Sequence, residues 1–292
     1  MFLIIKNVRV ISDGFSKAGF LSSEAFSTFK TDKTGWHALY TRGIMSYREG
    51  AEKFYDLFGA KDDAPFYIEL AREHGDKALE LGVGTARLAI QLAREGIDTW
   101  GIDNSPHMLK AAMRNIAKEP PEVRELLHLE LADVRRFHLD EAFGLVYFPS
   151  FSFDHILDRG DMLAALQAIK GHIAPGGVYA FELAHVPELK AEGGWFVQRK
   201  NLDESRLVVR TGHHSTDPKR RLMSMSLWYE VVEDGRITER YYDGSEVYVH
   251  SVEGVRALLD ETGFEVVEWY GDLMKGAFTE ESEMMAILAR PA

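Results

Sequence analysis

The chain contains no cysteine among its 292 residues. Disulfide bonds, thiolate nucleophiles and cysteine-ligated metal centres are therefore excluded. It also lacks any block of lysine and arginine, and its formal net charge is −12. A field of that sign repels a phosphate backbone, so we expect no nucleic-acid partner.

Long apolar runs are absent as well. The apolar start, residues 1–5, is too short for a signal-peptide core or a membrane span, so we expect a cytoplasmic protein with no membrane partner. What is present is ordinary for a globular protein, with 46% hydrophobic and 27% charged residues in a chain long enough to bury a large core. The histidines have no partners at ligand spacing, so we expect no metal site.

The most informative segment runs from residue 78 to residue 93. Apolar residues surround one acid, Glu80, and are followed by Gly82, Gly84 and a helix-forming run. Strand, glycine turn and helix form the opening unit of a nucleotide-binding α/β sheet. The next apolar run ends in Asp103, about 20 residues after the glycines, where an acid is placed to hold ribose hydroxyls. NAD and S-adenosylmethionine (SAM) both fit this pattern.

Two residues favour SAM over NAD. A dinucleotide-binding turn needs a small residue where this chain has Arg87. Glu80 is a poor neighbour for a diphosphate but a good one for the ammonium group of SAM. The plainer interpretation of Glu80 is a solvated carboxylate at the end of a strand.

Four segments together resemble the motifs of class I SAM-dependent methyltransferases. Residues 80–87 resemble motif I, and residues 101–109 resemble the second motif of that superfamily. Residues 131–135 resemble the third, and residues 172–178 resemble the turn before strand five. Their order and spacing are those of the superfamily. The resemblance covers residues 50–183 strongly and extends more loosely to the end of the chain.

The resemblance implies an α/β fold: a seven-stranded Rossmann-like sheet with helices on both faces, an N-terminal helical lid and an inserted small antiparallel β-sheet. The alternation of strands and helices independently favours a parallel sheet covered on both faces. Strands are expected near 77–81, 97–102, 127–131, 143–148, 177–183, 264–270 and 284–290. Helices are expected within 46–74, as two runs of which the second covers 65–74, and near 86–95, 106–117, 160–173 and 252–262.

Residues 223–231 predict the inserted sheet, because they are apolar at every second position and lie between two turn sequences. We therefore expect three parts. Residues 1–60 form an N-terminal extension and lid, residues 61–189 and 251–292 form the SAM-binding core, and residues 190–250 form an antiparallel cover over the substrate.

The resemblance also implies roles for individual residues of the cofactor site. The methionine end of SAM would lie against the glycine turn and Glu80, and the ribose against Asp103. Plainer interpretations stay open, because Met108 is equally suited to helix packing and Asp133 to capping a turn. The expected cofactor contacts are Glu80, Gly82, Gly84, Asp103, Asn104, Met108 (adenine face), Asp133 (adenine amine), Val134 (ring nitrogen, through its amide) and Phe148.

Residues 148–155 follow the fourth strand, where class I enzymes place their reacting groups. They lack the (Asn/Asp)-Pro-Pro-(Tyr/Phe) motif and resemble instead the Ser-Phe-x-His of small-molecule N-methyltransferases. The resemblance implies that His155 is a catalytic base near neutral pH, and that Ser152 and Tyr55 contact the acceptor. Alternatively, His155 caps a helix or lies hydrogen-bonded in the core. Phe151 departs from the family pattern, in which many members have Asn.

We therefore expect a SAM-dependent methyltransferase that transfers a methyl group to nitrogen or oxygen of a small-molecule acceptor and releases S-adenosylhomocysteine. Three alternatives stay open: a methyltransferase acting on a protein side chain or RNA, a non-catalytic SAM-binding module, and a nicotinamide-dependent dehydrogenase. A homodimer is compatible with each of them.

Overall fold

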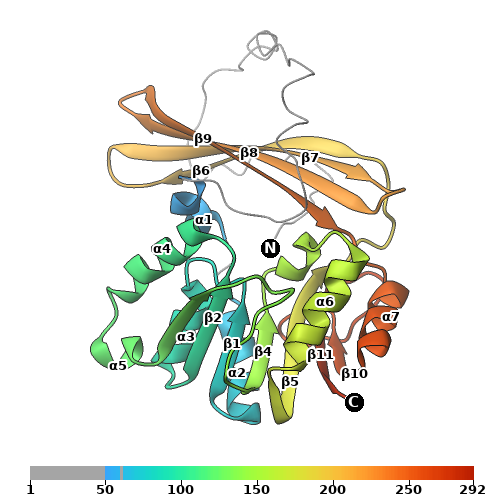
Figure 1. Ribbon diagram of the computed structural model, residues 1–292. Coiled ribbons are helices and arrows are strands. Elements are labelled where there is room, and N and C mark those ends of the chain that lie inside the picture. The colour runs from blue at the N-terminus through green and yellow to red at the C-terminus, as the bar shows by residue number, and fades with distance from the viewer. Residues whose placement is uncertain (1–49, 60–61) are drawn as a thin grey trace.

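The computed structural model describes residues 50–59 and 62–292. Its described part contains one seven-stranded sheet, sheet A, and one four-stranded sheet, sheet B, which lies across one edge of the core (Figure 1). The strands of sheet A are β1 (Lys77–Leu81), β2 (Asp98–Asp103), β3 (Leu127–Leu131), β4 (Phe143–Phe148), β5 (Ile173–Ala184), β10 (Phe264–Tyr270) and β11 (Met284–Pro291). The strands of sheet B are β6 (Gly193–Asn201), β7 (Arg206–Asp217), β8 (Leu222–Glu233) and β9 (Arg236–Tyr248).

Nine helical segments accompany the two sheets in the described residues. They are η3 (Ala51–Phe54), α1 (Tyr55–Phe58), α2 (Ala64–His74), α3 (Arg87–Arg94), α4 (Pro106–Ile116), α5 (Pro121–Arg124), η4 (Ser152–His155), α6 (Arg159–Lys170) and α7 (Val252–Thr262). No helix in this part of the chain is both long and apolar enough to cross a bilayer.

Sheet A has the strand order β10-β11-β5-β4-β1-β2-β3. Strands β1 to β5 pair in parallel, whereas β11 pairs antiparallel with both of its neighbours. The order reverses between β1 and β4, and ligands of such sheets bind beside the carboxyl ends of the strands at that point. The expected seven-stranded Rossmann-like sheet is confirmed.

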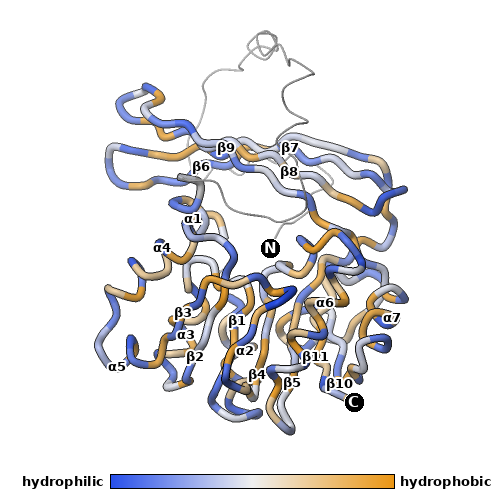
Figure 2. The backbone as a smooth tube through the Cα atoms, in the orientation of Figure 1, coloured by the Kyte–Doolittle hydropathy of each residue, from blue (hydrophilic) through white to orange (hydrophobic). Residues whose placement is uncertain are grey.

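Helices cover both faces of sheet A, as expected. Leu79 and Leu81 of β1 lie in one apolar cluster with residues of α6 and α7, whereas Ala78 lies in another with residues of α2 and α3. This alternation follows from the two-residue period of a strand, and it explains why the central strands are apolar throughout. Figure 2 shows the result: apolar colour concentrates in the core, and polar colour at the loops below it.

Two helical runs were expected within residues 46–74, the second from Pro65 to His74, and the structure agrees: α1 ends at Phe58 and α2 spans Ala64–His74. Two other expected boundaries were wrong. The helix expected over 160–173 ends at Lys170, and β5 begins at Ile173 rather than at residue 177. His172 lies between them, where its Nε2 accepts a hydrogen bond from the amide of Leu139. The expected extension over residues 1–45 lies outside the described residues.

Sheet B is antiparallel throughout, as the alternating pattern predicted. One of its faces packs on η3 and α1. Phe54 stacks on Tyr229 of β8 with ring centroids 5.3 Å apart, and the Arg210 guanidinium lies 4.2 Å from the ring centroid of Phe58. At the other end, Nδ1 of His155 in η4 lies 3.2 Å from the Glu246 carbonyl of β9. Sheet B therefore contacts segments at the carboxyl edge of sheet A.

Candidate functional site

The glycine turn after β1 is held against the end of β2. Gly82 and Gly84 have φ angles of +65° and +57°, a conformation that side chains disfavour. The amide of Gly84 donates to Oδ2 of Asp103 at 2.8 Å, and the amide of Val83 donates to the Ile102 carbonyl at 2.9 Å. Among the residues that the structure describes, a side chain at Gly84 would have only the Gly82 carbonyl near it, at 3.9 Å, so these residues leave the space above the turn open to a ligand.

Asp103 occupies the centre of this arrangement. Its Oδ1 accepts from the Ser105 amide at 2.8 Å, so each carboxylate oxygen has at least one backbone donor. A carboxylate oxygen can accept more than one hydrogen bond, which leaves capacity for two hydroxyls. Burial raises the pKa of Asp103, and backbone hydrogen bonds from Ser105, Gly84 and Asn104 oppose that rise. Asn104 itself is exposed beside it.

Glu80 is buried, so the interpretation as a solvated strand-end carboxylate is wrong. Its Oε2 accepts a hydrogen bond from the hydroxyl of Tyr147 at 3.0 Å. Burial raises the pKa of Glu80 to about 8, although the Tyr147 hydroxyl and the Arg87 charge lower it. A carboxyl group in this state gains most from a ligand cation, because an adjacent positive charge favours its ionised form.

The side chain of Arg87 is paired with another side chain of the protein, that of Asp63. Its Nη1 donates to Oδ1 of Asp63 at 2.7 Å, and its Nη2 bonds to the other carboxylate oxygen. Asp63 directly precedes α2, so this buried pair fastens α2 to the start of α3. A second bond, from Thr85 Oγ1 to Asp56 of α1 at 2.8 Å, fastens the preceding helix to the glycine turn. The predicted acceptor contact Tyr55 is half-buried in α1, next to Asp56.

The residues expected around the adenine lie in two places. Met108 is buried near the start of α4. Asp133 follows β3 and accepts bonds from Nε and Nη2 of Arg135, at 2.9 Å and 2.6 Å. These bonds from Arg135 lower the pKa of Asp133. Val134 is partly buried against the core. Arg135 thus shares the carboxylate that an adenine amine would use, and the adenine roles stay predictions.

The exit from β4 meets the glycine turn. A side chain on Gly82 would place its Cβ 3.2 Å from the ring of Phe148 and 3.7 Å from Cβ of Ser152. Three residues predicted from two separate segments are therefore neighbours. Between them, Ser150 and Phe151 have φ angles of +57° and +59°. Two consecutive residues other than glycine in this conformation indicate backbone strain, which is common at functional sites.

His155 faces the inserted sheet. The contact of its Nδ1 with the Glu246 carbonyl requires a hydrogen on Nδ1, so Nε2 carries the lone pair. Burial lowers the pKa of His155 to about 4. The imidazole is therefore neutral at physiological pH and holds a proton poorly. The role of His155 as a base stays a prediction. The observed geometry favours a structural role, in which the ring forms a hydrogen bond with the Glu246 carbonyl.

Sequence reasoning missed a buried network on the α2 side of sheet A. The hydroxyl of Tyr67 donates to Oε1 of Glu182 at 2.6 Å, and the rings of Tyr67 and Tyr147 lie 4.9 Å apart. Glu182 had a signal that could have found it, because it is the only acid within the apolar strand 178–184. The tyrosines and Asp63 had none, since their importance depends on contacts between distant segments.

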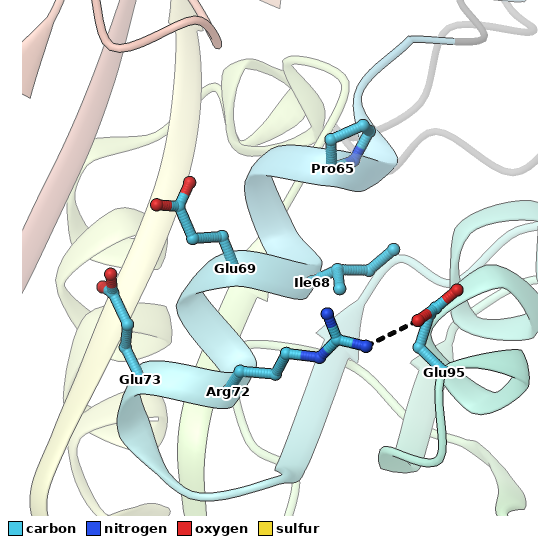
Figure 3. A pocket seen from close by; sticks show the side chains of 6 residues that line it. All are labelled: Pro65, Ile68, Glu69, Arg72, Glu73 and Glu95. Atoms are coloured by element: carbon cyan, nitrogen blue, oxygen red, sulfur yellow. Dashed lines mark hydrogen bonds and ion pairs between the residues drawn. The ribbon is translucent and has the colours of Figure 1, made fainter.

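The hollow shown in Figure 3 lies elsewhere. It opens along the outer side of α2 and is crossed by an ion pair between Arg72 and Glu95 at 2.5 Å. Its lining contains none of the residues predicted to bind a cofactor or an acceptor. The lining residues are Pro65, Ile68, Glu69, Arg72, Glu73 and Glu95.

Comparison with known proteins agrees with this geometry. Residues 78–177 match the family model described as a methyltransferase domain. The chain is 26% identical over 263 residues to the glycine/sarcosine N-methyltransferase of Aphanothece halophytica, a match that covers 84% of this chain and 89% of the relative.

Two solved structures show the same fold. The CcbJ methyltransferase from Streptomyces caelestis superposes with a TM-score of 0.70 at 18% identity, over 82% of this chain and 96% of its own. The sugar N-methyltransferase KedS8 from a Streptoalloteichus species superposes with a TM-score of 0.66 at 19% identity, over 96% of this chain and all of its own. The KedS8 match extends over most of the chain. Residues 78–177 are therefore a methyltransferase domain by the family match, and the fold of the two solved structures extends over most of the chain.

Proposed function

We propose that this enzyme transfers the methyl group of SAM to a nitrogen of a small-molecule acceptor. The observation that carries the proposal is the glycine turn tied to Asp103, beside a buried carboxyl group and directly under the exit of β4. Two relatives act on small amines by their printed names, one on glycine and sarcosine and one on a sugar. Oxygen is the second candidate for the acceptor atom, because the geometry of the β4 exit does not by itself distinguish it from nitrogen.

The cofactor contacts follow from the geometry of the turn. Asp103 would hold the ribose hydroxyls, with Asn104 at its side. Glu80 would pair with the ammonium group, and the backbone of Gly82 and Gly84 would lie against the methionine end. The remaining proposed contacts are Met108, Asp133, Val134 and Phe148.

The protein's part in the reaction is orientation and exclusion of water. The bound sulfonium supplies an electrophilic methyl group, so no covalent enzyme intermediate is needed. Phe148 and Ser152 would fix the acceptor atom behind that methyl group, and proximity of this kind supplies much of the acceleration in two-substrate reactions. Tyr55 in α1 would close the site from the other side.

The three expected parts of the chain correspond to cofactor binding, covering of the acceptor and closure of the site. We propose residues 61–189 and 251–292 as the SAM-binding core and residues 190–250 as the cover over the acceptor. Phe54 supports this division, because it packs α1's neighbour η3 against sheet B. Residues 1–60 would complete the lid.

Two measurements test the function. Thermal shift should show stabilisation by SAM and S-adenosylhomocysteine but not by NAD. Incubation of a lysate with [methyl-³H]SAM should leave the label in the low-molecular-weight filtrate. Label in protein or RNA would replace the small-molecule proposal with the macromolecular alternative. SAM binding without S-adenosylhomocysteine formation from any amine or hydroxyl acceptor would indicate a binding module.

A further inference from the structure

Glu182 is a buried carboxylate at the carboxyl edge of sheet A that has no assigned role. It is 3% exposed. Among the described residues, its hydrogen-bond donors are the Tyr67 hydroxyl at 2.6 Å and the Ser150 amide at 3.3 Å, and both reach the same oxygen, Oε1. No lysine, arginine or histidine of the described part of the chain forms an ion pair with it.

The surroundings of Glu182 disfavour its ionised form unless a cation lies beside it. Asp63 is close enough to raise its pKa, after the larger effect of burial, and the Glu182 charge in turn raises the pKa of Asp154. The Tyr67 and Ser150 hydrogen bonds and, as the smallest effect, the positive charge of the amino terminus lower this pKa, but they only partly oppose the rise. Buried carboxylates are normally paired, because an unpaired buried charge is strongly destabilised. A positively charged ligand would supply the partner.

The position of Glu182 separates it from the cofactor carboxylate. Glu80 pairs in register with Tyr147, and Tyr147 pairs with Ala180. Glu182 is therefore two strands and two residues away from Glu80, about 12 Å between Cα atoms for ordinary strand spacing and rise. It lies beside the β4 exit, where the acceptor is proposed to enter, and each carboxyl group has its own tyrosine donor.

Glu182 also holds the strained part of that exit. Its bond to the Ser150 amide reaches the first of the two residues with positive φ. A second link, from the Ala184 amide to Oδ2 of Asp154 at 3.0 Å, joins the end of β5 to η4. The end of β5 thus fixes the turn on which Ser152 is placed.

We propose that the acceptor is a positively charged aliphatic amine, and that Glu182 binds its ammonium group and accepts a proton from it. This proposal rests on the proposed function. The ammonium group R–NH₃⁺ loses one proton to the carboxylate, which becomes the neutral acid. The freed nitrogen lone pair forms the N–C bond to the methyl carbon as the C–S bond breaks and its electron pair stays on sulfur. The product leaves as R–NH₂⁺–CH₃, and the proton on Glu182 returns to solvent.

The test compares Glu182→Gln with Glu188→Gln. Glutamine keeps an oxygen that accepts from Tyr67 and Ser150 but removes the charge, whereas Glu188 is exposed in the loop after β5 and serves as the control. Probes are sarcosine, an amino sugar and the matching hydroxyl sugar. In the presence of S-adenosylhomocysteine, the amines should raise the Tm of the wild type and of Glu188→Gln but not of Glu182→Gln. The hydroxyl sugar should raise none.

Turnover supplies the second readout. With an amine that shifts the Tm, Glu182→Gln should lower kcat/KM at least about tenfold and lose the acidic limb of the pH profile, with unchanged SAM affinity. Four results would overturn the assignment: no amine shifts the wild-type Tm, the variant matches the wild type, amine and hydroxyl acceptors lose activity equally, or SAM affinity falls with the substitution. Failure to bind SAM at all would instead refute the proposed function.

Discussion

The two sheets of this enzyme are covered differently. Sheet A is packed by helices on both faces, and its central strands are buried, β4 over its whole length and β5 from Gly177 to Leu183. Among the described residues, helical segments pack on only one face of sheet B. Val208 and Tyr229 of that face are buried, whereas Trp195 and Val197 of β6 are 57% and 65% exposed.

This difference separates two tasks. A sheet enclosed on both faces can hold carboxyl groups such as Glu80 and Glu182 in a poorly solvated setting, where they interact strongly with a cation. A sheet with one packed face can instead cover the edge of that core and still tolerate changes in its outer residues. We expect binding of the methyl donor, SAM, to depend on sheet A. We expect the packing of the cover, residues 190–250, on the core to depend on the inner face of sheet B.

The largest effect is expected where the two regions meet. Phe54→Ala should lower the free energy of unfolding by about 3 kcal/mol, the scale for truncating a buried phenylalanine, because Phe54 is 4% exposed and stacks on Tyr229. Trp195→Ala on the outer face should cost less than about 1 kcal/mol, the scale of one partly exposed aromatic pair. Urea unfolding followed by circular dichroism measures both. Equal costs would mean that the two faces of sheet B are covered alike.

The next effect concerns the donor site in sheet A. Asp103→Ala should weaken SAM binding by at least about 2 kcal/mol, roughly 30-fold, the scale of hydrogen bonds to a charged group. Calorimetric titration with SAM measures it. Asp98→Ala, at the opposite end of the same strand, is the matched control and should leave the affinity unchanged. An unaltered affinity in Asp103→Ala would refute the ribose assignment.

The third effect is a pH dependence of donor binding. Because burial raises the pKa of Glu80 to about 8, most molecules carry a neutral Glu80 below that pH. Binding of the SAM ammonium favours the ionised form, so the affinity should rise with pH by up to about tenfold per unit below the Glu80 pKa. Glu80→Gln should abolish this slope. Glu130→Gln, exposed on β3, should retain it.

The raised pKa of Glu80 also predicts how stability depends on pH in the absence of ligand. The folded state of the wild type binds more protons than the unfolded state between the ordinary glutamate pKa and about 8. Stability should therefore fall as the pH rises through that window. Thermal unfolding above about pH 8 should show Glu80→Gln as the more stable protein, and a wild type that gains stability with pH would contradict the raised pKa.

The sequence predicted the donor site because that site is local. Gly82, Gly84 and Asp103 lie within two consecutive strand–turn units, and the turn geometry restricts which residues can occupy them. Glu80 was found as an acid in an apolar run, and the same rule applied to β5 would have found Glu182. The seven-stranded sheet followed from the order of the motifs, and sheet B followed from its two-residue period.

The remaining features depend on contacts that no local pattern encodes. Tyr67 and Glu182 are 115 positions apart, and their bond exists only because α2 packs on β4 and β5. Arg87 and Asp63 are 24 positions apart, and no local pattern indicates that they form a pair. The end of α6 was misplaced because Ile173 follows Ile169 at a four-residue step, although the helix has already ended at Lys170.

The smallest expected effect lies at the link between the two regions. His155→Ala should lower turnover about fivefold and leave SAM affinity unchanged, because it removes one hydrogen bond, worth about 1 kcal/mol, that holds η4 to the Glu246 carbonyl of sheet B. Since burial lowers the His155 pKa to about 4, the pH–rate profile near neutrality should not change. His213→Ala, on the outer face of sheet B beside Trp195, is the control and should be fully active. A loss of about 100-fold or more, together with a lost acidic limb, would instead make His155 the general base and remove that role from Glu182.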